Sequence, residues 1–89
     1  MKTHKYKWTR EQIRAARQAL LPEILEREGL SLRHTGADNY KPVEHPDMIV
    51  KDCYWRSARS DESGNTIDFL VKVRGMSFDQ AMETITKRT

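Results

Sequence analysis

The last quarter of the chain has the clearest helical spacing of apolar residues. Between Phe78 and Ile85, apolar side chains recur at intervals of three and four residues, which places them on one face of a helix. Ser77 and Gln80 have the spacing of a capping box, in which the serine hydroxyl and the glutamine side chain satisfy each other's free amides. The pattern therefore predicts a helix that begins at Phe78.

A second helix is predicted just before this one. Asn65 can cap a helix of about nine residues whose apolar positions include Ile67, Leu70 and Val71. Gly75 follows this run and is the residue at which the helix should end. The two helices predict a helical hairpin with one shared apolar face.

The N-terminal part of the chain predicts two further helices. Thr9 and Gln12 form another capping-box pattern, and Ile13, Ala16 and Leu20 then follow on one face. Pro22 interrupts this first helix.

Pro22 can also begin a second, short helix over residues 22–28, because a proline fits the first helical turn. Gly29 is the expected end of that helix.

From Leu32 onward the spacing changes to that of strands. Short strand candidates lie at residues 32–34, 40–43, 48–50 and 53–57, and the last two predict a hairpin because only two polar residues separate them. Pro42 makes the second candidate an edge strand. Residues 59–65 are expected to form a polar loop.

The expected architecture is α+β: N-terminal helices, a small antiparallel sheet of three or four strands, and the helical hairpin packed on one face of it. The expected core consists of apolar side chains from all three parts of the chain: Ile13, Leu20, Ile24, Leu25, Leu32, Ile49, Tyr54, Ile67, Leu70, Phe78, Ala81, Met82 and Ile85.

Composition limits the size of this core. The chain has 89 residues, of which 37% are hydrophobic and 33% charged, so we expect one small domain over residues 9–89 after a basic arm at residues 1–8. Cys53 is the single cysteine, which excludes an internal disulfide and fits a reducing compartment. No apolar run is long enough for a membrane span and no signal peptide follows the basic start, so a cytoplasmic location is expected.

Positive charge is concentrated at the N-terminus. Six cations against Glu11 alone give the first twenty residues a net charge of +5, whereas the whole chain carries +3. Arg10, Arg14 and Arg17 lie at spacings of four and three, so one helix face can contact phosphates. The alternative is an ordinary solvated helix face.

Aromatic residues accompany the basic arm. Tyr6 and Trp8 alternate with cations, a pattern that suits stacking on exposed bases beside phosphate contacts. Trp8 can instead pack as a hydrophobic staple on the helix that follows. Both alternatives remain open at this stage.

The hairpin segment resembles a known family. The runs GNTIDFL at residues 64–70 and RGMSF at residues 74–78, followed by Ala81, resemble the C-terminal part of the zinc-binding domain of bacterial DNA primases. The resemblance is closest to a variant at the front of primase-like, Toprim-containing proteins of plasmids and conjugative elements. It spans residues 9–86, and it implies a zinc-ribbon-like sheet and a non-catalytic domain that helps a separate catalytic domain to recognise template DNA.

The ligands for the zinc of that family are missing. The segments that would supply the two ligand pairs, residues 40–46 and 53–59, hold one histidine and one cysteine. A structural zinc site needs four nitrogen or thiolate ligands, and His34, His45 and Cys53 supply three at most. We therefore expect no metal and no cofactor, with Trp55, Tyr54 and Tyr40 holding the sheet instead.

Catalysis has little support in the sequence. The loop carboxylates are not paired with a base or a metal site, and no phosphate-binding loop, nucleophile elbow or zinc-protease motif occurs. The expected protein is thus not an enzyme, although it can be an accessory domain of a primase-like enzyme.

Two functions remain as hypotheses. The first is a DNA-binding module for replication or transfer of a mobile element, which contacts single-stranded template and works with a Toprim or primase catalytic domain or a helicase. The second is a protein-docking domain that keeps the fold without binding nucleic acid. The residues expected to bind nucleic acid are basic or aromatic: Lys5, Lys7, Trp8, Arg10, Arg14, Arg17, Arg56 and Arg59.

Overall fold

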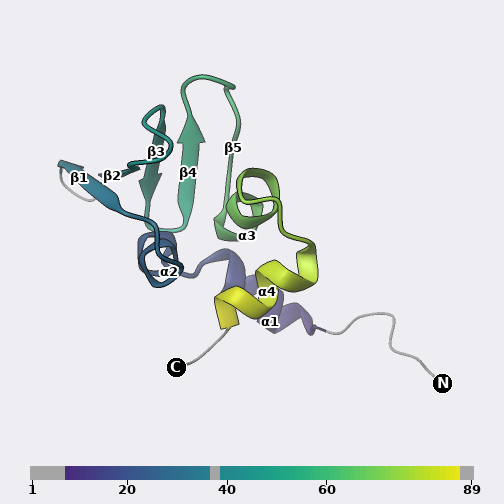
Figure 1. Cartoon of the computed structure of the whole chain (residues 1–89). Helices are drawn as coiled ribbons and strands as arrows, with labels where there is room; N and C mark the ends of the chain where they lie inside the picture. The colour runs from purple at the N-terminus through teal and green to yellow at the C-terminus, as the bar shows by residue number, and fades with distance from the viewer. Residues whose placement is uncertain (1–7, 37–38, 87–89) are drawn as a thin grey trace.

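The computed structural model describes residues 8–36 and 39–86, and these form an α+β fold (Figure 1). Two N-terminal helices precede a five-stranded sheet, and a helical segment follows it. The helical elements are α1 (Arg10–Arg17), α2 (Leu21–Arg27), α3 (Thr66–Asp68), the π-helix η1 (Phe69–Val73) and α4 (Phe78–Thr86). The strands are β1 (Leu32–Gly36), β2 (Asn39–Pro42), β3 (Met48–Lys51), β4 (Tyr54–Ser57) and β5 (Ser63–Gly64).

The helices begin where the capping signals predicted. The Thr9 hydroxyl accepts the Gln12 amide at 3.0 Å and the Gln12 side chain accepts the Thr9 amide at 2.8 Å. Ser77 and Gln80 make the same reciprocal pair ahead of α4. These caps satisfy amides that lack a partner inside the helix.

The sheet is an antiparallel meander in the order β1-β2-β3-β4-β5. The prediction of three or four strands therefore missed at least one strand, because β5 lies inside the expected loop. Ser63 and Gly64 pair with Arg56 and Trp55. A polar two-residue strand at a sheet edge has no sequence signal of its own, which is why it was missed.

Cross-strand register determines which side chains face the helices. Val50 pairs with Trp55 and with Tyr40, and Val50 and Trp55 are fully buried. Because side chains alternate along a strand, Ile49 and Tyr54 point to the opposite face, where they are 43% and 51% exposed. Their assignment to the core was wrong, and so was the expectation that Tyr54 helps to hold the sheet.

Trp55 joins the sheet to the helical segment. Its ring meets the ring of Phe69 edge to face at 5.6 Å, and its indole N–H donates to the Asn65 carbonyl at 3.0 Å. The Thr66 hydroxyl, also buried, donates to the Ala19 carbonyl at 2.6 Å and ties the same segment to the end of α1. The expectation that Trp55 is a structural residue is confirmed.

The helix expected after Asn65 is divided into two parts. Asn65 caps α3 and exchanges hydrogen bonds with Asp68, but a π-helix follows, in which the Arg74 amide bonds to the Phe69 carbonyl five residues earlier. Phe69 and Leu70 are both fully buried in this turn. Gly75 ends the segment at a φ of +75°, a conformation that suits glycine.

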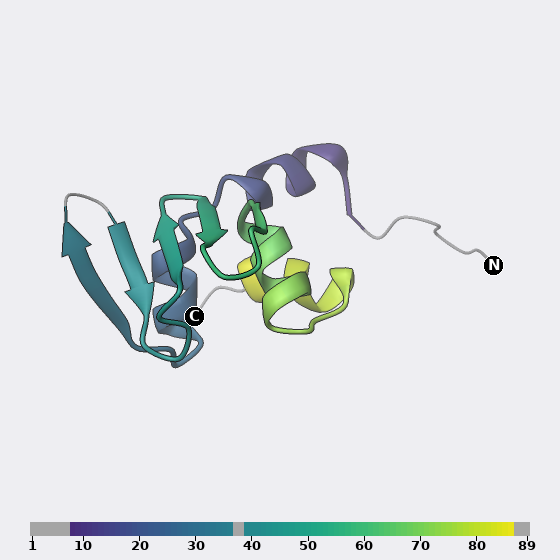
Figure 2. The same ribbon diagram turned by 90° about the horizontal axis from the view of Figure 1, so that it is seen from above.

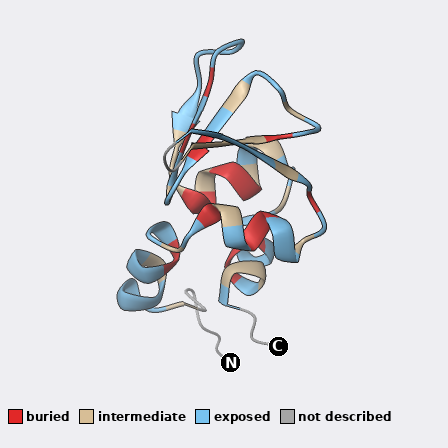
Figure 3. Cartoon of the chain, turned by 90° about the vertical axis from the view of Figure 1, so that its left-hand side faces the viewer, coloured by how far each residue is buried: buried red, intermediate tan, exposed pale blue. Residues whose placement is uncertain are grey.

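The core lies between the helices and one face of the sheet (Figures 2 and 3). Two further core predictions were wrong: Leu20 and Phe78 are 47% and 43% exposed. The residue after Leu20 takes its place, because α2 begins at Leu21, one residue before the predicted start. The hydrophobic core residues that the prediction omitted are Ala16, Leu21, Leu30, Val50, Trp55 and Phe69.

Replacing Trp55 with phenylalanine should lower the free energy of unfolding by about 2 kcal/mol. The change leaves a cavity and removes the hydrogen bond to the Asn65 carbonyl. Urea denaturation followed by far-ultraviolet circular dichroism measures the loss. The matched control is Tyr54→Phe at the preceding residue. This variant should change the free energy of unfolding by less than about 0.5 kcal/mol, because the Tyr54 side chain faces outward. Equal losses in the two variants would contradict the observed register.

Candidate nucleic-acid interface

The face of the sheet that points away from the helices is rich in cations. Lys51 lies opposite Tyr54, and Ile49 lies opposite Arg56, all four on the exposed side of β3 and β4. Tyr54 is therefore an exposed aromatic ring with a cation across the ladder and a second one two residues along its own strand. Stacking surfaces beside cations are the arrangement that single-stranded nucleic acid requires.

Two more cations extend this surface onto the neighbouring strands. Arg33 of β1 and Lys41 of β2 are direct cross-strand partners, and like charges in that position repel each other. Both line a hollow of about 260 Å³ together with Pro42, Val43 and Pro46. An anion bound there would relieve the repulsion.

We call this surface the outer sheet face and define it by Arg33, Lys41, Ile49, Lys51, Tyr54 and Arg56. Among the described strand residues on this side, none is a carboxylate. Asp61, in the loop after β4, comes within 4.0 Å of Arg56, but both side chains are mostly exposed. An exposed pair of this kind contributes little, so the surface keeps its positive charge.

The predicted arginine stripe lies on α1, which belongs to the helical layer rather than to the sheet. Arg10, Arg14 and Arg17 are all exposed, one helical turn apart. Within the described parts of the chain, none of the three has a carboxylate within ion-pair distance. Their guanidinium groups remain available to phosphates, and the predicted role stays a prediction.

The other residues predicted to bind nucleic acid are dispersed. Trp8 is partly buried against the core and its indole N–H donates to Asp79 at 3.0 Å, so it anchors α1 to α4. Arg59 lies in the loop between β4 and β5, 3.8 Å from Asp47. Lys5 and Lys7 lie outside the described residues.

Three cations of the outer sheet face were not predicted: Arg33, Lys41 and Lys51. Arg33 and Lys41 each stand between two strand residues that lie on the opposite face of the sheet, and Lys51 follows the buried Val50. Recognising Lys51 required knowing which residues of β3 point inward. Assigning Ile49 and Tyr54 to the core reversed the inward and outward positions of β3 and β4.

The segments that would hold zinc in the primase family do lie side by side. The Ala58 amide donates to the Asp47 carbonyl at 2.9 Å, and Arg59 pairs with the Asp47 carboxylate. This joint connects the turn after β2 to the loop after β4. A backbone hydrogen bond and an exposed ion pair thus join these two parts of the chain.

The available ligand residues do not fit a tetrahedral metal site. His45 lies in the turn before β3, with its ring edge to face on Phe69 at 6.5 Å, whereas Cys53 lies in the turn after β3, at the other end of that strand. His34 lies on β1 with its ring 5.0 Å from that of Tyr40. Across residues 8–36 and 39–86, no three potential ligands from histidine, cysteine, aspartate and glutamate form a group that could hold a metal ion.

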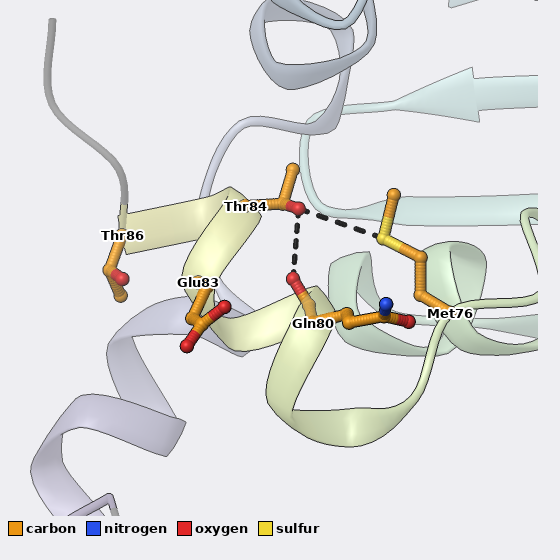
Figure 4. Close-up of a pocket in the computed structure, with 5 residues that line it drawn as sticks. All are labelled: Met76, Gln80, Glu83, Thr84 and Thr86. Atoms are coloured by element: carbon orange, nitrogen blue, oxygen red, sulfur yellow. Dashed lines mark hydrogen bonds between the residues drawn. The ribbon is translucent and has the colours of Figure 1, made fainter.

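A further hollow, of about 470 Å³, lies along α4 (Figure 4). Its lining residues are Met76, Gln80, Glu83, Thr84 and Thr86. The Thr84 hydroxyl donates to the Gln80 carbonyl at 2.8 Å and contacts the Met76 sulfur at 3.6 Å. No cation is among these lining residues, so the hollow does not suit a phosphate.

No protein-family model matches the chain, and no curated protein matches it significantly. In the described part of the chain, no helix combines the length and apolar character needed to cross a membrane. The primase resemblance therefore stays an interpretation of the sequence.

Removing metal should leave the stability of the domain unchanged. We expect the same urea midpoint with and without EDTA, since a backbone hydrogen bond from Ala58 to Asp47 joins the two turns and no group of potential ligands in residues 8–36 and 39–86 could hold a metal ion. The measurement is circular dichroism on one preparation divided in two, with metal content determined in parallel. A midpoint that falls with EDTA and recovers with zinc would contradict this expectation.

Proposed function

We propose that this chain is a non-catalytic module that binds single-stranded DNA through its outer sheet face. The observation that carries the proposal is the exposed Tyr54 ring between Lys51 and Arg56, with the Arg33–Lys41 pair on the adjoining strands. The ring offers a stacking surface to a base, and the cations offer partners to the phosphates on either side. The primase resemblance, reached independently from residues 64–81, implies the same class of ligand.

The shape of this surface favours a single strand over a duplex. Stacking on Tyr54 requires a base with a free face, which paired bases inside a helix do not offer. A duplex would meet the same sheet through phosphates alone. We therefore expect tighter binding of single-stranded than of duplex DNA at equal ionic strength.

The arginine stripe on α1 is a second contribution in this proposal. Arg10, Arg14 and Arg17 would add phosphate contacts that raise affinity without reading sequence. In the primase-like context that the resemblance implies, the module would act in the cytoplasm during replication or transfer of a mobile element. Its partner would be a Toprim or primase catalytic domain or a helicase.

The alternative is a protein-docking domain, and two exposed apolar residues favour it. Ile49 is 43% exposed on the outer sheet face, and Val43 is 58% exposed beside it. A docking surface of this kind would depend on apolar contact and respond little to salt. The affinity for nucleic acid should instead fall steeply as the salt concentration rises. One salt titration therefore separates the two functions.

Removing two cations from the outer sheet face should weaken DNA binding and flatten its salt dependence. For the double variant Arg33→Gln, Lys41→Gln, the slope of log affinity against log salt should fall by about 0.7 per cation removed. Fluorescence anisotropy with a labelled single strand at several salt concentrations measures both quantities. Lys72→Gln is the matched control, because Lys72 is an exposed cation on η1, outside the sheet. A slope that changes equally in both proteins would rule out the sheet as the interface.

Truncating the Tyr54 ring should weaken binding without changing the salt slope. We expect Tyr54→Ala to lose about 1 to 3 kcal/mol of binding free energy for single-stranded DNA, the usual value of one stacked base. The same titration measures it, with Tyr54→Phe expected to keep wild-type affinity because stacking needs only the ring. If both variants bind like the wild type, bases do not stack on this residue.

A further inference from the structure

A cleft on the helical side of the molecule lies beside the arginine stripe and outside the outer sheet face. It has a volume of about 410 Å³, within the range of small-molecule pockets. Its lining residues come from α1, the start of α3, η1 and the first residue of α4: Arg17, Asn65, Ile67, Asp68, Val71 and Phe78. The cleft thus brings together a cation, a carboxylate and an aromatic ring.

The apolar part of the cleft offers an aromatic surface. Phe78 has the helical spacing of a core residue, yet it is 43% exposed, while Ala81 and Met82 from the same helix are fully buried. Ile67 and Val71 lie one turn apart and line the cleft with it. A flat ring bound here would rest on Phe78 with aliphatic contacts beside it.

The polar groups of the cleft are not fully used by the protein. Arg17 has no carboxylate within ion-pair distance in residues 8–36 and 39–86. One oxygen of Asp68 accepts the Asn65 amide at 3.0 Å, and the other accepts no hydrogen bond from the described residues. The cleft therefore offers a donor for an anion and an acceptor for an N–H group.

We propose that this cleft binds one nucleotide of a single-stranded nucleic acid and favours a base that carries an amino group. The base stacks on Phe78, its amino group donates to Asp68, and Arg17 contacts the adjoining phosphate. This inference rests on the proposed function, and it adds a second contact that discriminates between bases.

The arginine stripe supports a nucleic acid as the occupant. Arg17 belongs both to the cleft and to the stripe, and Arg10 lies seven residues earlier on α1, about 10 Å away at 1.5 Å per residue. A strand that follows the stripe would bring a few phosphates past these guanidinium groups and would reach the cleft at its end. Charge complementarity and continuity with the stripe thus point to the same ligand.

Asp68 gives the proposal a specific consequence. A carboxylate accepts a hydrogen bond from the N4 amino group of cytosine, whereas thymine presents the O4 acceptor at that position. The two pyrimidines are similar in size, so their comparison isolates the hydrogen bond from the stacking. The module should prefer cytosine to thymine.

The test compares oligodeoxycytidylate with oligodeoxythymidylate, each about eight nucleotides long, by fluorescence anisotropy. Wild-type protein should bind the cytosine strand about tenfold more tightly. Asp68→Asn keeps the shape of the side chain and an oxygen for the Asn65 amide, but it turns an N–H donor toward the base, so the ratio should fall to one or below. A wild-type ratio near one, or an unchanged ratio in Asp68→Asn, would overturn the proposal.

Two further variants keep the test decisive if Asp68→Asn does not fold. Arg17→Gln, at an exposed side chain, and Phe78→Leu, which keeps apolar bulk without a ring, should each weaken both strands severalfold and leave their ratio unchanged. Unchanged affinity in both variants would exclude the cleft as a nucleotide-binding site. Its occupant would then be of another kind, such as an acidic protein segment.

Variants of the outer sheet face distinguish a failure of the cleft inference from a failure of the proposed function. If Arg33→Gln, Lys41→Gln lowers affinity while the cleft variants bind like the wild type, the module binds DNA without the cleft. If neither strand binds wild-type protein at low salt, the proposed function itself is wrong, and this inference with it.

Discussion

The burial of Trp55 determines most of what the surface of this domain can do. The indole lies between the sheet and the helical segment, packs on Phe69 and donates to the Asn65 carbonyl. Because strand side chains alternate, a buried Trp55 places Tyr54 and Arg56 outside. Cross-strand pairing then carries the same orientation to Lys51 and Ile49. One large side chain, turned inward, thus produces the cationic and aromatic outer sheet face.

The features that the sequence predicted well are those encoded by neighbours in the chain. Each predicted cap, at Thr9, Asn65 and Ser77, is present with both of its hydrogen bonds. These motifs need only residues three apart, so no tertiary contact can easily override them. The β3–β4 hairpin was predicted for a similar reason, since two strand-like runs are separated by a two-residue turn.

The features that the sequence did not reveal depend on contacts between distant residues. Tyr54 and Trp55 are both aromatic, and Ile49 and Val50 are both β-branched, so alternation alone does not show which of each pair faces inward. The choice is made by Phe69, a residue fourteen positions after Trp55 that offers its ring to it. The π-helix was not predicted either, since the apolar spacing after Asn65 predicts a helix but not the hydrogen bond that the Arg74 amide makes to the Phe69 carbonyl five residues earlier.

The same distinction, between features set by neighbours in the chain and features set by distant contacts, applies to the residues of the candidate site. The arginine stripe on α1 was predicted because helical spacing alone brings its residues together, and the structure leaves all three exposed. Arg33, Lys41 and Lys51 were missed because their common surface exists only once five strands have paired in register. A search for charge along the sequence finds clusters on one helix far more readily than clusters on a sheet.

The joint between the turn after β2 and the loop after β4 shows how such a small domain holds its sheet. Its ion pair between Arg59 and Asp47 is exposed and is worth at most about 1 kcal/mol. The stronger contribution comes from beneath, where the rings of His45 and Trp55 both meet Phe69 edge to face. Phe69 therefore contacts both the turn after β2 and strand β4. The Trp55–Phe69 contact that turns Trp55 of β4 inward and the His45–Phe69 contact that supports the turn after β2 share Phe69, so the outer sheet face and the support beneath it depend on the same side chain.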